Sequence, residues 1–433
     1  MFDRQPLSVL VERHIGGGTP ARADSAFWRG EIPWASVKDF VDGLLELRGT
    51  EESITEAGLR ASTSNLIPAG TPLVCTRMAV GRAAVASVPL AINQDVRALF
   101  PTVVTDGRYL LRVLASLQHN ADARAVGSTV KGIRTADYLA LDVPVAPPDQ
   151  QPIIAKILDT LDTQIRRTEA LIAKLEQIKQ GLLTDLLTRG IDENGQLRPS
   201  PDQAPHLYKD SPLGLAPRAW TISKLREKAD AGIPHLRTGP FGSALKGEHW
   251  VKEGHPVITI GSLGEGHFDK SELLFVAEHD AQRLADYQLK LGDIVFSRVA
   301  DVGRSVAITK AEVGWIISSN LMRISLDRNE VVPAFLQMQL SSEVAKRQVR
   351  SNVNAGGRDV ANSAIMNQLL FVWPDYSEQR RICDRMNAVD AMSNAHSRAL
   401  TGLGQLKEGL MDDLLTGRVR VTPLLEKAEQ AAG

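Results

Sequence analysis

The sequence KQGLLTDLLTRGI at residues 179–191 returns as KEGLMDDLLTGRV at residues 407–419. The second copy begins 228 positions after the first (407 minus 179), and both contain the run DLLT, at residues 185–188 and 413–416. A segment written twice in one chain indicates a duplicated architecture, and an internal repeat changes the interpretation of the whole fold.

The repeat extends upstream at the same offset. PDQQPIIAKILDTLDTQI at residues 148–165 aligns with YSEQRRICDRMNAVDAMS at residues 376–393, and no gap is needed from Gln151 to Thr188. In both copies the apolar positions step by alternating threes and fours, a heptad pattern that predicts a long helix with one narrow apolar stripe. The stripe consists of Ile154, Leu158, Leu161, Ile165, Ile172, Leu175, Leu182 and Leu186 in the first copy and of Ile382, Met386, Val389, Leu400, Leu403, Leu410 and Leu414 in the second, with Thr168, Lys179, Ser393, His396 and Lys407 as polar steps.

A stripe this narrow suits a two-helix seam better than a helix that faces a globular core. The other copy is the obvious partner, and a two-fold relation between the copies makes the pairing antiparallel. Each helix spans roughly 55 to 60 Å at the rise of an α-helix. The polar steps weaken a free coiled coil, which suggests that partner subunits cover part of the seam. The heptads alone favour a plain coiled-coil scaffold over any more specific function.

Length and composition predict a multidomain cytoplasmic protein. A chain of 433 residues is more than one core usually holds, so two or three domains are expected. Its two cysteines, Cys75 and Cys383, cannot form a disulfide framework or a common zinc site. We find no signal peptide and no run of about 18 apolar residues, so we expect neither export nor membrane insertion. The net charge of −1 gives no electrostatic reason to expect nucleic acid, although clustered cations can be hidden in a balanced total.

Two blocks of about 150 residues precede the two helices, and they resemble each other weakly but in order. GEIPWASVKDF (residues 30–40) is echoed by GHPVITIGSLG (254–264), and IPAGTPLVCTRMAVGRAAVA (67–86) by LKLGDIVFSRVADVGRSVAI (289–308). Residues 67–86 and 289–308 share one order of features. Each begins with a Gly turn and an apolar strand, continues with Thr or Ser before a first Arg, and then has Gly before a second Arg. Mixed α/β or β-rich domains are predicted, joined by a surface linker rich in Pro, Gly and Asp.

Four motifs carry a resemblance to a known family. They are the P…Q…I start of each helix (Pro148, Gln151, Ile154; Pro374, Gln379, Ile382), the KxGLxxDLLT helix end, the strand GDIVFSRVADVGR and the LAPRAW segment before the second block. In this order, and with the helices duplicated at constant offset, the chain resembles the specificity subunit of Type I restriction-modification systems over essentially its whole length. The first block departs from the pattern because it lacks the P…W segment.

The resemblance implies an α+β fold with a pseudo-two-fold internal repeat, in which two globular α/β target recognition domains are separated by two long helices that pair as an antiparallel coiled coil. The implied boundaries are 1–148 for target recognition domain 1, 149–190 for conserved spacer helix 1, 191–216 for the linker, 217–375 for target recognition domain 2, 376–418 for conserved spacer helix 2 and 419–433 for the C-terminal tail.

The resemblance also implies a function. In this family each recognition domain reads one half of a split double-stranded DNA target, the coiled coil sets the gap, and the subunit itself is non-catalytic. The implied partners are two copies of a DNA adenine methyltransferase (modification) subunit, which motor-nuclease restriction subunits can join. No cofactor is expected on this chain, because S-adenosylmethionine, and ATP with Mg where a motor subunit is present, belong to those partners. The alternative is a coiled-coil adaptor whose end domains bind protein.

Motifs for catalysis are absent from the sequence. There is no GxxxxGK[ST] phosphate loop, and no Asn or Asp followed by Pro-Pro and an aromatic residue, as an adenine methyltransferase would need. PDYSEQR at residues 374–380 faintly resembles a nuclease acid cluster, but a helix start explains it better. His249, His255 and His267 lack partners at metal-ligand spacing, so no metal site is expected.

Basic and amide side chains on loops of the two blocks are the candidates for DNA contact, because Lys and Arg neutralise phosphates while Arg, Asn and Gln read base edges. The candidates are Arg77, Arg82, Lys131 and Arg134 in the first block and Lys246, Arg298, Arg304, Arg350, Asn352, Asn354 and Arg358 in the second. Any one of them could instead be a solvated charge or part of an internal ion pair. The matched arginines of the two blocks could be structural, since target-reading residues should differ between domains that read different sequences.

Overall fold

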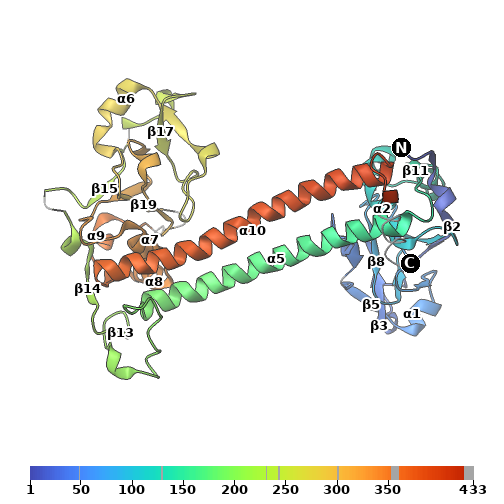
Figure 1. Cartoon of the computed structure of the whole chain (residues 1–433), viewed down its shortest axis with the longest axis horizontal. Helices are drawn as coiled ribbons and strands as arrows, with labels where there is room; N and C mark the ends of the chain where they lie inside the picture. The colour runs from blue at the N-terminus through green and yellow to red at the C-terminus, as the bar shows by residue number, and fades with distance from the viewer. Residues whose placement is uncertain are drawn as a thin grey trace. The chain divides into compact units, whose positions relative to one another are not determined.

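The computed structural model describes residues 1–47, 49–127, 130–230, 232–241, 244–299, 302–352 and 360–423. The chain divides into two compact units, one formed by Met1–Ala170 with Ser397–Gly433 and the other by Leu171–His396. Each unit combines one globular domain with parts of two long helices, α5 (Gln151–Thr188) and α10 (Tyr376–Thr416) (Figure 1). The two long helices predicted from the heptads are therefore present, with 38 and 41 residues.

The first globular domain is built on two small sheets. Strands in the order β2-β10-β7-β8-β4 form one sheet, strands in the order β5-β3-β9-β6 form the other, and β1 pairs with β11. The strands are β1 (Arg4–Pro6), β2 (Val11–Gly16), β3 (Trp28–Ala35), β4 (Glu46–Leu47), β5 (Glu52–Ile54), β6 (Leu66–Ile67), β7 (Leu73–Cys75), β8 (Ala83–Ala86), β9 (Leu90–Ile92), β10 (Val96–Pro101) and β11 (Asp142–Pro144). The helices are α1 (Glu56–Arg60), α2 (Gly107–Ser116), α3 (Gln118–Arg124) and α4 (Thr135–Leu139).

The second globular domain repeats this plan. Its sheets have the orders β15-β22-β19-β20 and β16-β18-β17-β21, and β14 pairs with β23. The strands are β14 (Thr221–Lys224), β15 (Leu236–Thr238), β16 (Trp250–Val251), β17 (His255–Ile258), β18 (Leu274–Val276), β19 (Ile294–Ser297), β20 (Ser305–Ala307), β21 (Ile316–Ile317), β22 (Leu321–Ile324) and β23 (Leu370–Trp373), after the linker hairpin β12 (Tyr208–Lys209) and β13 (Ala216–Pro217). The helices are α6 (Glu278–Arg283), α7 (Pro333–Ser341), α8 (Glu343–Asn352) and α9 (Ser363–Met366).

The strand pairings show that the two domains share a core topology, although β4 and β6 of the first domain and β16 of the second have no strand at the equivalent place in the other. In the first domain β3 runs parallel to β9, with Trp34 opposite Ala91, and antiparallel to β5. In the second, β17 runs parallel to β21, with Val257 opposite Ile316, and antiparallel to β18. The sequence segments that matched weakly and in order thus fold into equivalent strands, which confirms the α+β class.

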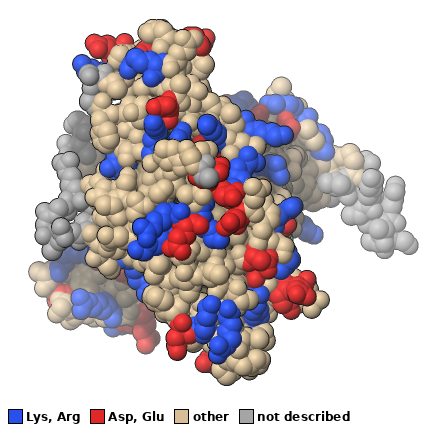
Figure 2. Space-filling view, turned by 90° about the vertical axis from the view of Figure 1, so that its left-hand side faces the viewer, with Lys and Arg blue, Asp and Glu red and all other residues tan. Residues whose placement is uncertain are grey.

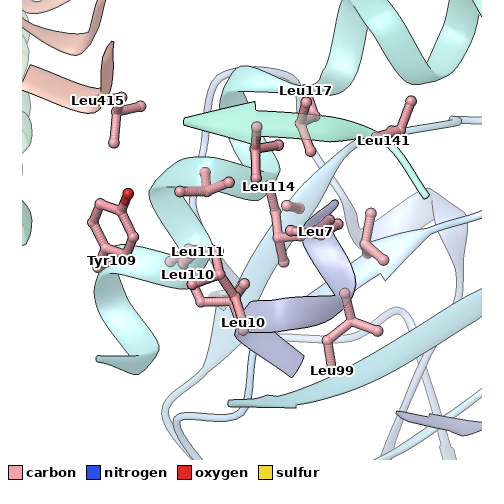
Figure 3. Close-up of a cluster of buried hydrophobic side chains, with 14 of the residues drawn as sticks. Leu7, Leu10, Leu99, Tyr109, Leu110, Leu111, Leu114, Leu117, Leu141 and Leu415 are labelled. Atoms are coloured by element: carbon pink, nitrogen blue, oxygen red, sulfur yellow. The ribbon is translucent and has the colours of Figure 1, made fainter. Parts of the chain in front are cut away.

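Each end of the helix pair is anchored in the core of a globular domain. In the first unit, Leu7, Leu10 and Leu99 pack with the apolar face of α2, and Leu415 of α10 joins the same cluster (Figure 3). The backbone N–H of Phe2 donates to the carbonyl of Thr416 over 2.8 Å. The first domain is therefore built around residues from both extremes of the sequence.

Within each unit a stretch of α5 lies beside a stretch of α10, and the direction is antiparallel in both (Figure 1). In the first unit, Ile154 and Leu158 near the start of α5 pack with Leu414 near the end of α10. In the second, Leu186 near the end of α5 packs with Ile382 near the start of α10. All the predicted stripe positions, apolar and polar, are buried or half-buried.

A glycine with a left-handed backbone follows the end of each long helix, Gly190 with φ +68° after α5 and Gly417 with φ +70° after α10. Left-handed glycines commonly end helices because they lack the Cβ that would clash. A Cβ on Gly190 would lie 2.4 Å from the Trp220 ring, and one on Gly417 would lie 2.7 Å from the Phe2 ring. Phe2 thus takes in the first unit the place that Trp220 of the LAPRAW segment takes in the second, although the sequence shows no matching motif there.

Candidate nucleic-acid interface

A glutamine at the start of each long helix ties that helix to its globular domain. The Oε1 atom of Gln151 accepts from the backbone N–H of Asp106 over 2.9 Å, and its Nε2 atom donates to the carbonyl of Ala146 over 2.9 Å. Gln379 makes the equivalent bonds, accepting from Val332 over 2.9 Å and donating to Pro374 over 3.0 Å. Both glutamines are buried, so their amide dipoles are satisfied without water. The P…Q…I motif is therefore a joint between domain and spacer.

Two ion pairs cross the helix seam at equivalent places. Lys407 Nζ lies 2.6 Å from Asp162 Oδ1 in the first unit, and Lys179 Nζ lies 2.6 Å from Asp390 Oδ1 in the second. The lysines are two of the five polar steps of the heptad pattern, and each has a partner on the facing helix. A charged residue at a seam position favours the register in which its partner is opposite.

A buried arginine fastens the first domain to the same seam. Arg112 of α2 has a side chain only 2% exposed, and it pairs with Asp159 over 2.5 Å and with Asp162 over 2.6 Å. Arg108 adds a more exposed pair to Asp159 over 2.7 Å. Asp162 therefore holds both Arg112 and the seam lysine Lys407. Sequence reasoning passed over Arg112, because nothing local distinguishes it from a surface arginine.

The candidate cations of the first domain are mostly paired on its surface. Arg77 pairs with Asp95 over 3.2 Å, Lys131 with Asp122 over 2.7 Å, and Arg134 with Asp137 over 2.8 Å. The side chains of Arg77, Lys131 and Arg134 stay 49%, 44% and 86% exposed, so all three remain within reach of a phosphate. Arg82 differs, because its Nη1 atom donates inward to the carbonyl of Phe40 over 3.0 Å.

The candidates of the second domain fall into three groups. Arg298 and Arg304 donate to backbone carbonyls, Arg298 to Ser319 over 3.2 Å and Arg304 to Leu263 over 2.7 Å. Lys246, Arg350 and Asn352 are exposed, and Arg350 also pairs with Glu343 over 2.8 Å. Asn354 and Arg358 lie outside the described residues.

The second arginine of each matched pair has the same structural role in both domains. Arg82 holds the carbonyl of Phe40 in the loop after β3, and Arg304 holds that of Leu263 in the loop after β17. These contacts favour a structural role for Arg82 and Arg304 over a role in reading bases, the alternative that the matched sequence left open.

Four loops come together at one edge of the first domain. Thr19 donates to Gln94 over 2.6 Å, linking the loop after β2 to the turn before β10. The N–H of Met78, in the turn after β7, donates to the carbonyl of Lys131 over 2.8 Å. A Cβ on Gly17 would lie 1.8 Å from the carbonyl oxygen of Ile92, so only glycine allows this approach. This meeting of loops presents cations and amides together.

The second domain brings the corresponding loops together. The N–H of Arg298 donates to the carbonyl of Asn320 over 3.1 Å, and its carbonyl accepts from the N–H of Ala361 over 2.8 Å. A Cβ on Gly239 would lie 2.0 Å from the carbonyl oxygen of Ser318, the counterpart of the contact at Gly17. We call these two surfaces the loop edges of the first and second domains.

The charge on the visible face of the second unit is mixed. Figure 2 shows basic and acidic side chains interspersed over that face rather than one continuous positive field. The second unit also has a groove of about 800 Å³, lined by parts of α5, α7, α8 and α10, including Lys179, Leu183, Met338, Lys346 and Asp390.

Among the described residues, no group of three or more His, Cys, Asp or Glu side chains could hold a metal ion. His255 contacts Glu278, His249 lies 3.3 Å from Asp280, and His267 contacts the carbonyl of Glu265 over 3.0 Å. Burial raises the pKa of the Cys383 thiol to about 12, which leaves it protonated and a poor nucleophile at neutral pH. In the described part of the chain, no helix is long and apolar enough to cross a membrane.

Comparisons with known proteins agree with this architecture. A sequence model of the family described as Type I restriction modification DNA specificity domain matches residues 12–177 and 219–401. The specificity subunit of the Type I restriction enzyme MjaVIII from Methanocaldococcus jannaschii is 22% identical over 329 residues, covering 74% of this chain and 72% of the relative. The EcoKI specificity subunit from Escherichia coli (strain K12) is 24% identical over 337 residues, covering 71% and 68%.

Solved structures share the fold. A Type-I restriction-modification system S subunit from M. genitalium has a TM-score of 0.55 at 17% identity, with 96% of each chain covered. The HsdS subunit from Thermoanaerobacter tengcongensis has a TM-score of 0.51 at 15% identity, with 96% of this chain and 97% of that chain covered. At such identities the match concerns the fold alone.

Proposed function

The chain belongs to the Type I restriction modification DNA specificity family, and we propose that it is the subunit that directs a Type I restriction-modification complex to a bipartite DNA target. The observation that carries the proposal is the duplication. Two domains of one core topology, each joined by an equivalent buried glutamine to one of two equivalent helices, suit a reader of two half-sites.

In this proposal each globular domain reads one half-site, and the helix pair sets the number of bases between them. DNA rises about 3.4 Å per base pair, so a change in the length of a rigid spacer becomes a change in the number of unread bases. The two domains share strands but differ in the side chains of their loop edges, as two readers of different sequences require.

The proposed partners are double-stranded DNA and two copies of a DNA adenine methyltransferase subunit, with motor-nuclease restriction subunits as further partners. The duplication supports two copies, because a two-fold repeat offers the same surface twice. S-adenosylmethionine, and ATP with Mg where a motor subunit is present, would be bound by those partners. This chain is proposed to be non-catalytic and cytoplasmic. The adaptor alternative gains no support from any of the comparisons.

Mapping methylated adenines in cells with and without this chain tests the proposal. We expect methylation at one split sequence that disappears when the chain is deleted. Methylation that is unchanged by the deletion would contradict the proposed function. Purified methyltransferase subunits should likewise methylate that sequence only when this chain is added.

A further inference from the structure

We propose that Met78 in the first domain and Phe241 in the second make apolar contacts with DNA bases and so contribute to half-site specificity. The inference rests on the proposed function and names side chains within it. Neither residue was among the candidates chosen from the sequence, which were all basic or amide side chains.

Met78 combines a strained backbone with an exposed side chain. Its φ is +62°, and among the described residues only Arg29 is another non-glycine residue with positive φ. The N–H of Ala79 donates to the carbonyl of Arg77 over 2.8 Å, which closes a three-residue turn around Met78. Turns of this hand are rare and strained, and such strain gathers at functional sites. Met78 is nevertheless 61% exposed, so burial of its side chain does not offset the strain.

The surroundings of Met78 suit the grooves of DNA. Arg77 precedes it, Lys131 accepts its N–H, and both cations have side chains about half exposed, at 49% and 44%. Gln94, an exposed amide, completes the same loop edge through its contact with Thr19. Cations neutralise phosphates and amides read base edges, while an apolar side chain between them can contact a thymine methyl or the face of a base.

The second domain has an apolar residue at the corresponding place, but it comes from another loop. Phe241 is 64% exposed, and its ring centroid lies 5.7 Å from the guanidinium carbon of Arg298. Arg298 aligns with Arg77, so each domain sets one large apolar side chain beside that arginine. The hydrogen bonds of Arg298 to the carbonyls of Ser319 and Ala361 keep it in place under the ring.

Exposure alone would not single out these residues, because isolated apolar side chains are common on protein surfaces. Met78 and Phe241 are singled out by where they lie and by how they differ from each other. Both lie on the loop edge, beside the first of the matched arginines, and they differ in residue type and in loop of origin. The second matched arginines, Arg82 and Arg304, are identical and face carbonyls. The exposed apolar residue therefore differs between the two domains, while the arginine that holds the loop in place is the same. Two domains that read different sequences require such a difference.

The test uses the complex with its methyltransferase subunits and a DNA library in which each half-site position is varied in turn. Met78→Gly removes the side chain and keeps the turn, since glycine accepts positive φ. We expect Met78→Gly to reduce discrimination about tenfold at one or two positions of one half-site, and Phe241→Ala to do so only in the other. Val103→Ala and Val313→Ala, at residues 95% and 50% exposed in other loops, should leave the profile unchanged.

Unchanged discrimination at both half-sites in Met78→Gly and Phe241→Ala, with wild-type methylation of the target, would overturn this inference. An equal loss at both half-sites from either variant would also overturn it, because that pattern indicates general damage. Thermal unfolding of each variant identifies a failure to fold, and Met78→Leu, which keeps an apolar side chain, should then retain more discrimination than Met78→Gln. A wild-type complex with no sequence preference would instead contradict the proposed function.

Discussion

Lys407 pairs with Asp162 across the helix seam, Nζ to Oδ1 over 2.6 Å, and the repeat contains the same pair again as Lys179 and Asp390 at the same distance. In the alignment of the copies Lys179 matches Lys407 and Asp162 matches Asp390. Each pair therefore joins the lysine of one copy to the aspartate of the other. A slip of either helix by one residue would separate both pairs, so together they favour one register.

The pair in the second unit can be tested by charge reversal. Lys179→Asp places two carboxylates together and should lower the free energy of unfolding by roughly 1 kcal/mol, while Lys179→Asp with Asp390→Lys should recover most of it. Urea unfolding of the four proteins of this double-mutant cycle measures the coupling. Lys174→Asp, at an exposed position of the same helix, is the control and should change little. A coupling free energy of zero would mean that the Lys179–Asp390 pair does not stabilise the register of the two helices.

The spacer can be tested as a ruler. Seven residues inserted into α5 alone should impair methylation of the split target, because α5 then has one heptad more than α10 and the two ends of the helix pair can no longer both keep their register. Matched insertions of seven residues in α5 and α10 lengthen the pair by about 10 Å, so the preferred gap should grow by about three base pairs. Methylation of substrates with different gaps measures this. An unchanged gap after matched insertions would exclude the ruler.

Lys246 tests for contact with phosphate. It is exposed in the segment between β15 and β16, and Lys246→Ala should weaken DNA binding by the complex equally for all sequences. The slope of log affinity against log salt should fall by about 1, because one fewer counterion is released. Lys310→Ala, in a different loop, provides the comparison. An affinity that does not depend on salt even in the wild type would favour protein partners over DNA.

Arg304 tests the assignment of the matched arginines. Its Nη1 atom donates to the carbonyl of Leu263, so Arg304→Ala should reduce the free energy of unfolding by about 1 to 2 kcal/mol. Sequence preference should not change at any half-site position once the protein is folded. Arg134→Ala, which removes an exposed surface pair, should cost much less. A change in base preference without loss of stability would make Arg304 a reading residue.

Asp375 predicts a dependence of stability on pH. The hydroxyl of Ser377 and the N–H of Glu378 donate to its carboxylate, and they lower its pKa in the folded protein. A lowered folded pKa stabilises the protein above the unfolded value near 4, and this stabilisation is lost as the pH falls through the folded pKa. Asp375→Ala should therefore be less stable than wild type by about 1 kcal/mol at pH 7. The difference in unfolding free energy between wild type and Asp375→Ala should be smaller at pH 3 than at pH 7. An equal difference at both pH values would refute the lowered pKa of Asp375.

The long helices could be predicted to within a few residues, because their signals are local. A heptad stripe repeats every three or four residues, and the glycines that end the helices follow the stripe directly. The duplicated strands were harder to place. Short strands carry little periodicity, and their order became visible only because the segments matched in pairs.

The candidate site was predictable in part. Loop cations such as Arg77 and Lys131 do lie on a shared loop edge, but composition could not distinguish them from Arg82, which turns inward to the carbonyl of Phe40. Met78 was missed because a positive φ leaves no mark on a methionine in the sequence. Phe2 was missed because a different aromatic residue fills the place of Trp220.

The sequence by itself determined the repeat, the two amphipathic helices and the family, since all three are recorded in residue order and spacing. Only the tertiary structure decided which charges face each other. Lys407 and Asp162 are 245 positions apart (407 minus 162), and ion pairs over such separations depend on how the chain returns on itself. Periodicity shows that a helix has a stripe to bury, but the contacts of a single side chain depend on the residues that folding brings beside it.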